Sequence, residues 1–206
     1  AVQAIGKIPV SSYLTDRVDF ATFSGHKFHA VRGVGFVYKK AGKKITPLLT
    51  GGGQEKDFRS TTENVAGIAS MAKALRLVTD KEEFSLPKIA KMKKIIFDEL
   101  AKYQDITIFS GEGEDFAPNI LTFGIKGVRG EVIVHAFEEH QIYISTTSAC
   151  SSKAGKPAGT LISMGVPTKL AQTAVRISLD DDNDMGQVEQ FLTIFKQVYA
   201  KTQKVR

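Results

Sequence analysis

The sequence predicts an α/β or α+β fold, and three observations along the chain support that prediction. The first 58 residues hold short runs of strand-forming residues separated by glycine-containing loops. A helical period of apolar residues takes over near residue 60 and lasts to about residue 103. From there to the end, strand patterns and helix patterns alternate, which is typical of chains that pack helices against a sheet.

The composition limits the classes of protein to which the chain can belong. Its 206 residues are 42% apolar and 24% charged, as in a soluble globular protein. The single cysteine excludes an internal disulfide and a cysteine-rich zinc site, and it favours a reducing cytosol. No apolar run approaches the roughly 20 residues of a membrane helix, so we expect no membrane partner.

The formal net charge of +6 would suit an acidic partner or nucleic acid. The lysines are scattered, however, and no aromatic residues interleave with them as in a nucleic-acid-binding motif. A solvated helix face explains the local cluster of Lys88, Lys91, Lys93 and Lys94. We therefore expect no direct nucleic-acid partner.

The expected elements of the first part follow from local patterns. Strands are predicted over residues 18–23 and 33–38, because both runs are rich in β-branched and aromatic residues. The Ser-Thr-Thr-Glu run at 60–63 matches a capping box and predicts a helix that ends near Asp80. A second helix, with a proline near its entrance, is predicted through residues 89–103. The inward face expected for the first helix consists of Val65, Ile68, Ala72 and Leu75.

The second part reads as strands and helices in turn. We expect strands over residues 106–109, 119–123, 142–145 and 174–179. We expect helices over residues 131–140 and 158–164, and a last helix capped by Asn183 or Asp184.

A polar cluster, Ser24-Gly25-His26-Lys27, stands where the first predicted strand ends. The ordinary interpretation of Lys27 is a solvated cation at a strand end. The chemical alternative is an amine that forms a Schiff base with an aldehyde cofactor. The four residues by themselves leave both interpretations open.

Cys150 is the second candidate for chemistry. A lone cysteine is usually a small buried hydrophobe, but residues 145–159 are small and polar, which favours an exposed, mobile loop. Lys153 and Lys156 stand nearby and favour the thiolate form of the cysteine. This environment is typical of a reactive cysteine.

Arg176 is the third candidate, because it interrupts an otherwise apolar strand. It is either a charge on the exposed face or a guanidinium that binds a substrate carboxylate, and the sequence leaves both open. His26 and His29 are three positions apart, but four histidines and one cysteine supply no ligand set with metal spacing. We therefore expect no metal site.

Seven segments, taken in order, carry a resemblance to a known family. They are Val2-Gln3-Ala4-Ile5-Gly6-Lys7, Phe23-Ser24-Gly25-His26-Lys27, Arg32-Gly33-Val34-Gly35, Gly51-Gly52-Gly53-Gln54-Glu55, the Arg-Ser-Thr-Thr-Glu-Asn-Val-Ala-Gly run at 59–67, Ser148-Ala149-Cys150 and Arg176-Ile177-Ser178-Leu179. Across nearly the whole chain they resemble the NifS-like cysteine desulfurases, pyridoxal-phosphate enzymes of the class V aminotransferase group. The loop around Cys150 resembles the long, mobile loop of the group I enzymes rather than the short loop of group II.

The resemblance implies roles toward pyridoxal 5′-phosphate. Lys27 would form the Schiff base with the cofactor and then move protons at the α-carbon of the substrate. Ser24 and His26 would hydrogen-bond the cofactor phosphate, and Gln3 would hydrogen-bond its phenolic oxygen. Thr62 would reach the phosphate of the neighbouring subunit, because the family forms homodimers with shared sites.

The resemblance also implies the reaction and the partners. Arg176 would hold the carboxylate of L-cysteine, and the Cys150 thiolate would take the substrate sulfur as a persulfide and release L-alanine. The parent protein would be a cytoplasmic enzyme that passes sulfur to an acceptor protein, either an iron–sulfur scaffold or a tRNA-thiolation enzyme. Residues 1–80 would form the C-terminal part of a fold-type-I large domain, ending in a long helix. Residues 81–206 would form the smaller α+β domain with the cysteine loop.

The chain departs from the family in two ways. Thr61 stands where the family usually has glycine, in the loop that meets the neighbouring phosphate. The aspartate that pairs with the pyridinium nitrogen would sit one position before Ala1, with a stacking histidine and an asparagine farther upstream. The chain also lacks an initiator methionine and a signal peptide, so we expect it to begin inside a longer protein. Because an unpaired pyridine nitrogen weakens the electron sink, we expect these residues by themselves to release no sulfide.

Two alternatives to a desulfurase stay open. One is another enzyme of the same fold, a selenocysteine lyase or an aminotransferase. The other is a non-catalytic scaffold that has kept the fold. The joint presence of Lys27, Cys150 and Arg176 argues against the scaffold, which has no need of all three.

Overall fold

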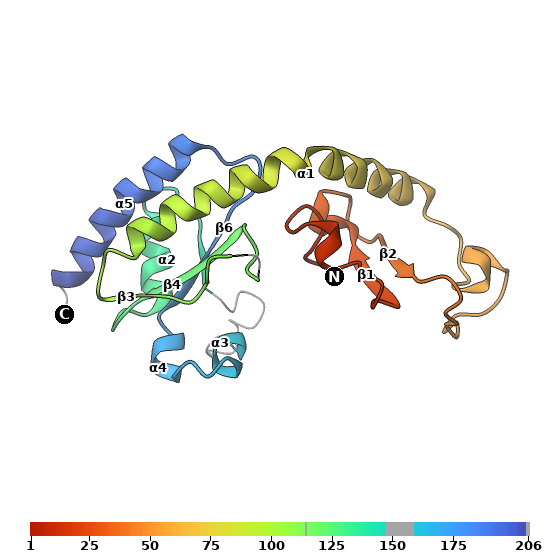
Figure 1. The fold of residues 1–206 in the computed structure, drawn as a ribbon, viewed down its shortest axis with the longest axis horizontal. Helices are drawn as coiled ribbons and strands as arrows, with labels where there is room; N and C mark the ends of the chain where they lie inside the picture. The colour runs from red at the N-terminus through yellow and green to blue at the C-terminus, as the bar shows by residue number, and fades with distance from the viewer. Residues whose placement is uncertain (114, 147–158, 205–206) are drawn as a thin grey trace. The chain divides into compact units, whose positions relative to one another are not determined.

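The computed structural model describes residues 1–113, 115–146 and 159–204, and the chain divides into two compact units, Ala1–Phe84 and Ser85–Arg206 (Figure 1). The elements of the first unit are η1 (Val10–Ser12), β1 (Phe20–Ser24), η2 (Gly25–Phe28), β2 (Gly35–Lys39) and η3 (Gln54–Asp57), where η marks a 3-10 helix. The long helix α1 (Val65–Leu100) begins in the first unit and ends in the second. The elements that follow are β3 (Ile106–Ile108), β4 (Ile120–Ile125), α2 (Gly130–Glu138), β5 (Ser145–Thr146), α3 (Gly159–Ser163), α4 (Thr168–Ala171), β6 (Ala174–Ser178) and α5 (Met185–Lys204). None of the helices in the described ranges is long and apolar enough to cross a membrane.

The first unit is built around the antiparallel pair of β1 and β2, so both strands expected there are confirmed. Side chains alternate between the two faces of this pair. On one face Phe23, which is 4% exposed, stacks on Phe36 with ring centroids 4.6 Å apart. On the other face Thr22 lies opposite Val37, and both are exposed. The pair therefore has one core face and one open face.

Helix α1 begins at Val65, and Asn64 caps it. The Asn64 side-chain oxygen accepts a hydrogen bond from the backbone N–H of Gly67 at 3.0 Å. The predicted capping box is wrong, because the Ser60 hydroxyl has a different partner. It accepts a hydrogen bond from the backbone N–H of Gly52 at 3.0 Å and so belongs to the preceding glycine loop.

The inward face of α1 in the first unit also differs from the prediction. Val65 is 72% exposed and Ile68 is 40% exposed, although both were expected inside. The buried or half-buried residues at helical spacing are Gly67, Met71, Ala74 and Val78. A Cβ atom added to Gly67 would lie 2.4 Å from Cγ1 of Val34. The glycine lets this face of the helix approach its neighbour closely.

One continuous helix replaces the two that were predicted, with Pro87 inside it. A proline in a helix removes one backbone hydrogen bond and crowds the carbonyl four residues earlier. The division between the two units falls between Phe84 and Ser85, within a turn of that proline. The proline thus marks the place where the helix is weakened, and the helix continues through it to Leu100.

The second unit contains a four-stranded antiparallel sheet in the order β3-β4-β6-β5. Phe123 of β4 lies opposite Val175 of β6, and both are completely buried. They share a core with side chains of α1, α2 and α5. Figure 1 shows α5 running beside the C-terminal half of α1 over this sheet. Helices gathered on one face of an antiparallel sheet give the α+β arrangement expected for this part.

The opposite face of the sheet is only partly covered. Ala174 packs with Leu161 of α3 and Ala171 of α4. The next residue of β6 on this face is Arg176, which lies opposite Thr122 of β4 on one side and Ser145 of β5 on the other. We call these three residues the Arg176 row.

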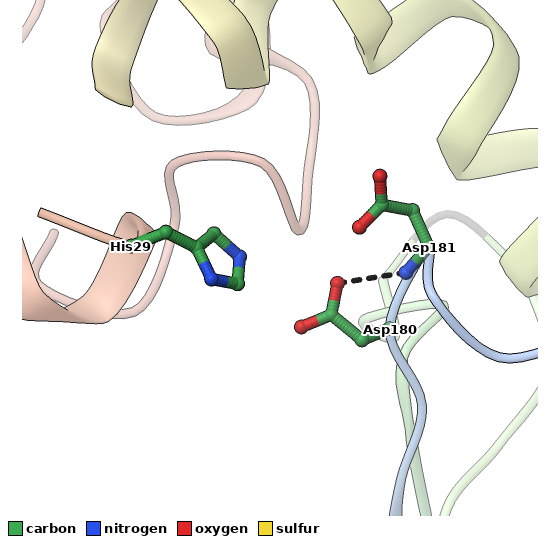
Figure 2. Close-up of side chains that lie close together, drawn as sticks. All are labelled: His29, Asp180 and Asp181. Atoms are coloured by element: carbon green, nitrogen blue, oxygen red, sulfur yellow. Dashed lines mark hydrogen bonds between the residues drawn. The ribbon is translucent and has the colours of Figure 1, made fainter. Parts of the chain in front are cut away.

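The turn after β6 is closed by aspartates. The carboxylate of Asp180 accepts a hydrogen bond from the backbone N–H of Asp181 at 2.7 Å (Figure 2). Asp184 then caps α5 by accepting a hydrogen bond from the backbone N–H of Gln187 at 2.9 Å, which confirms the expected cap. His29, also drawn in Figure 2, belongs to the first unit.

Candidate functional site

Lys27 lies on the short turn η2, directly after β1. The apolar side of this turn is anchored in the core, because Phe28 is 1% exposed and Phe23 is 4% exposed. The backbone N–H of Gly25 donates a hydrogen bond to the carbonyl of Val34 at 2.8 Å, which joins the start of the turn to the loop before β2. The half-buried Lys27 therefore leaves the backbone at a well-anchored point, as amine catalysis on a bound carbonyl requires.

Ser24 and His26 stand beside Lys27 on the same turn. Ser24 is half-buried and His26 is exposed. Ser24 has an extended backbone, with φ −114° and ψ 121°, and its side chain makes no capping hydrogen bond to the turn. Its hydroxyl is therefore not used to hold the turn together. The three residues form a short polar stretch between the buried Phe23 and Phe28.

The first turns of the chain bring Gln3 into the same unit. Ile5 packs in the same core as Phe28, and the ammonium of Lys7 donates a hydrogen bond to the backbone carbonyl of Lys27 at 2.7 Å. The segment that carries Gln3, which is itself exposed, is therefore tied to the turn that carries Lys27. Sequence reasoning gave Lys7 no role, and its only signal was its place in a segment that resembles the family.

Thr62 lies exposed in the loop between the glycine run and α1. Within the described part of the chain, no hydrogen bond joins its side chain to Ser24, His26 or Lys27. Thr61 beside it is exposed as well. The role of Thr62 at a neighbouring phosphate stays a prediction.

Arg176 belongs to the second unit, at the centre of the Arg176 row. Its Nε is buried, and none of the residues that the structure describes forms a hydrogen bond with it. A guanidinium N–H without a partner is costly, because the group loses its water and gains nothing in return. A carboxylate fits this donor, since a guanidinium binds it through two parallel hydrogen bonds.

The other two members of the row surround Arg176 with hydroxyl groups. Directly opposite residues of an antiparallel pair point to the same face with Cβ atoms about 5 Å apart. Thr122 is 9% exposed, and Ser145 is half-buried. The row therefore presents one cation between two small polar side chains, away from the apolar core.

Cys150, Lys153 and Lys156 lie outside the described residues. The last described residue before them is Thr146, at the end of β5, and the first after them is Gly159, at the start of α3. The interpretation of Cys150 as a reactive nucleophile stays a prediction from the sequence.

The chain is similar to known proteins along nearly its whole length. The family model described as aminotransferase class-V matches residues 1–191. A NifS/IcsS protein homolog of Lactobacillus delbrueckii subsp. bulgaricus is 46% identical over 204 residues, which are 99% of this chain and 53% of that protein. The cysteine desulfurase IscS of Dictyoglomus turgidum is 35% identical over 181 residues, which are 87% of this chain and 45% of that protein. The chain spans about half the length of the curated relatives that it matches.

Solved structures agree with these relatives. A NifS-like protein matches with a TM-score of 0.80 and 33% identity, over 97% of this chain and 51% of that one. A NifS-like protein from Rickettsia africae gives a TM-score of 0.80 and 32% identity, over 97% and 52% of the two chains. The expected fold class, part of a fold-type-I pyridoxal-phosphate transferase fold, is confirmed. By its sequence and its fold, this chain belongs to the aminotransferase class-V family.

Proposed function

We propose that the chain is part of a pyridoxal-phosphate-dependent cysteine desulfurase, which converts L-cysteine to L-alanine and leaves a persulfide on Cys150. The observation that carries the proposal is Arg176, a partly buried cation whose Nε has no hydrogen-bond partner among the described residues. The relatives of the chain include proteins named cysteine desulfurase. The activity belongs to the full-length protein, because the chain spans about half the length of those relatives. We expect the 206 residues by themselves to release no sulfide.

The residues of the first unit fit the cofactor. Lys27 supplies the amine at an anchored strand end, and Ser24 has a hydroxyl that the turn does not use as a cap. Ser24 and His26 would bind the phosphate, Gln3 the phenolic oxygen, and Thr62 the phosphate of the partner subunit in a homodimer. When bound, pyridoxal phosphate supplies the electron sink for chemistry at the α-carbon.

The remaining work falls to side chains of this chain. Arg176 binds the carboxylate of L-cysteine and so orients the substrate. Lys27 moves the proton at the α-carbon. The Cys150 thiolate attacks the substrate sulfur, and the sulfur–carbon bond breaks. Its electron pair stays with the carbon, which takes up a proton and leaves as L-alanine.

We also propose a cytoplasmic location and a protein acceptor for the persulfide sulfur. The acceptor would be an iron–sulfur scaffold or a tRNA-thiolation enzyme. Support for this proposal comes from relatives named cysteine desulfurase IscS. Sulfur transfer from Cys150 to another protein requires the cysteine to reach two partners in turn, which suits a loop position.

Cys150→Ala in the full-length protein separates a desulfurase from an aminotransferase. We expect this variant to keep the visible absorbance of the bound cofactor and to lose persulfide formation, because only the sulfur acceptor is removed. Cofactor absorbance and persulfide labelling with L-cysteine measure the two effects. An unchanged rate of L-alanine formation in Cys150→Ala would refute the desulfurase proposal.

Arg176→Ala tests the substrate clamp. We expect the half-saturating L-cysteine concentration to rise about 30-fold or more, because a charged hydrogen-bonded partner of the carboxylate is lost. Arg129→Ala is the matched control, since Arg129 is an exposed arginine of the same unit with an ion pair to Glu131 at 3.4 Å. Equal effects of the two substitutions would argue against the clamp.

A further inference from the structure

We infer that Lys7 is a positioning residue for Lys27, and this inference rests on the cofactor role proposed for Lys27. The Lys7 ammonium donates a partly buried hydrogen bond of 2.7 Å to the backbone carbonyl of Lys27, twenty positions farther along the chain. A hydrogen bond from a charged donor is roughly twice as strong as one between neutral groups. The contact therefore fixes the peptide from which the Lys27 side chain departs.

The rest of the turn explains why this contact matters. The side of η2 that follows Lys27 is held by Phe28, which is 1% exposed. The backbone N–H of Ala30 donates to the carbonyl of Gly25 at 3.0 Å, so the turn closes around Lys27. Four residues of 3-10 helix have little stability of their own. The bond from Lys7 adds an anchor at the residue whose amine must be placed accurately.

Lys7 can serve as an anchor because its own backbone is held. Gly6 has φ 69°, a left-handed conformation, and a Cβ atom there would lie 2.3 Å from Cγ1 of Val78 on α1. The backbone N–H of Lys7 donates to the carbonyl of Ala4 at 3.0 Å. The ammonium thus reaches Lys27 from a turn that packs closely on the helix.

The same turn carries Gln3, the residue proposed for the phenolic oxygen of the cofactor. The Lys7–Lys27 hydrogen bond therefore joins two segments that have to face one ligand. Two other lysines of this unit also donate to backbone carbonyls, Lys39 to Lys43 at 2.8 Å and Lys40 to Asp16, but both bonds are exposed. They offer the same chemistry at places unrelated to Lys27.

The test compares Lys7→Met, Lys7→Arg and the control Lys40→Met in the full-length protein. Each protein is incubated with pyridoxal 5′-phosphate, reduced with borohydride and mapped by peptide mass spectrometry for the adduct at Lys27. We expect the pyridoxal-phosphate concentration that half-labels Lys27 to rise about tenfold in Lys7→Met. Lys7→Arg, which keeps a charged donor, restores most of the labelling, and Lys40→Met labels like the unmodified full-length protein.

Amide hydrogen exchange supplies a readout that does not involve the cofactor. In Lys7→Met the amides of residues 26–30 should exchange faster, while those of β4 stay unchanged. If Lys7→Met does not fold, Lys7→Gln, which has a neutral donor, is used in its place.

Three outcomes would overturn the inference, and they are distinguishable. Unchanged exchange at residues 26–30 in Lys7→Met would show that the Lys7–Lys27 hydrogen bond does not stabilise the turn η2. Faster exchange with unchanged labelling at Lys27 would make Lys7 a purely structural residue. Absence of selective labelling at Lys27 in the unmodified full-length protein would instead overturn the proposed cofactor role, and the role of Lys7 with it.

Discussion

Lys93 and Lys91 stand two positions apart on α1 and belong to one lysine cluster in the sequence. The structure separates them, because Lys93 is 6% exposed and Lys91 is exposed. The Lys93 ammonium donates a hydrogen bond to the carbonyl of Ala117 at 3.0 Å. Burial lowers the pKa of Lys93 from its ordinary value of 10.5, and the carboxylate of Glu112 opposes the shift. The expectation of a solvated helix face is therefore wrong for this member of the cluster.

This burial predicts an alkaline effect on stability. Below the lowered pKa both the folded and the unfolded chain keep the proton, and burying the charge costs stability. As the pH rises through that pKa toward 10.5, the folded state releases the proton first, so the free energy of unfolding gains a favourable contribution from Lys93. Lys93→Met should lack this gain. Urea unfolding of both proteins between pH 7 and pH 10 measures it.

Lys91→Met is the control for that experiment, because its side chain is exposed on the same helix. Its pH dependence should match that of the unmodified chain. A Lys93→Met variant with the same pH dependence as the unmodified chain would contradict the prediction.

The first-unit part of helix α1 has two apolar faces, and only one of them packs in the core. Val65 and Ile68 have the spacing of an amphipathic face, yet both are exposed. The buried stripe includes Gly67 and Ala74, whose small side chains shorten the distance between the helix and its neighbours. Close packing favours that stripe because dispersion attraction falls steeply with separation. Hydrophobic periodicity predicts the helix, but it cannot rank two faces that differ in shape.

Gly67→Ala should destabilise the first unit by about 1–3 kcal/mol through overpacking. The added Cβ would lie 2.4 Å from Cγ1 of Val34 and 2.6 Å from Nδ2 of Asn64, the capping residue. Thermal or urea unfolding gives the change in free energy.

Gly186→Ala provides the matched control, because the same methyl group in the first turn of α5 would meet only Oδ1 of Asp184, at 3.3 Å. Helix propensity predicts a neutral or slightly stabilising effect at that position. Equal destabilisation by the two substitutions would show that steric fit at Gly67 is not the cause.

The two units differ in the size of their cores. Among the described residues, the main buried cluster of the second unit has 15 members and that of the first unit has 6. The first unit also leaves large apolar side chains in solvent, with Leu48 at 95% and Phe84 at 76%. Its sheet has only two strands, an arrangement that is marginally stable in water without further packing. We therefore expect the second unit to be the more stable part of this chain.

Amide hydrogen exchange should resolve this difference. We expect the amides of β1 and β2 to exchange roughly tenfold or more faster than those of β4 and β6, because local opening follows buried apolar contact. Addition of low urea should widen the gap, since the first unit would open before the second. Equal protection in the two sheets, or a single opening event for both, would contradict this prediction.

The candidate site was predictable only as far as its residue types. The Ser-Gly-His-Lys stretch at a strand end, and an arginine within an apolar strand, were both visible in the sequence. The buried Nε of Arg176 was not, because it depends on how β4, β5 and β6 align. The contact of Lys7 with Lys27 was not visible either, since no local pattern links the two lysines.

Local chemistry by itself determined the strands β1, β2, β4 and β6, a cap for α5 at either Asn183 or Asp184, and the family through its ordered segments. These features depend on backbone geometry and on neighbours close in the chain. Tertiary structure alone decided that α1 continues past Pro87, which of its faces is buried, and that Lys93 lies inside. The physical reason is that packing and desolvation depend on residues far apart in the sequence, and only the folded chain brings them together.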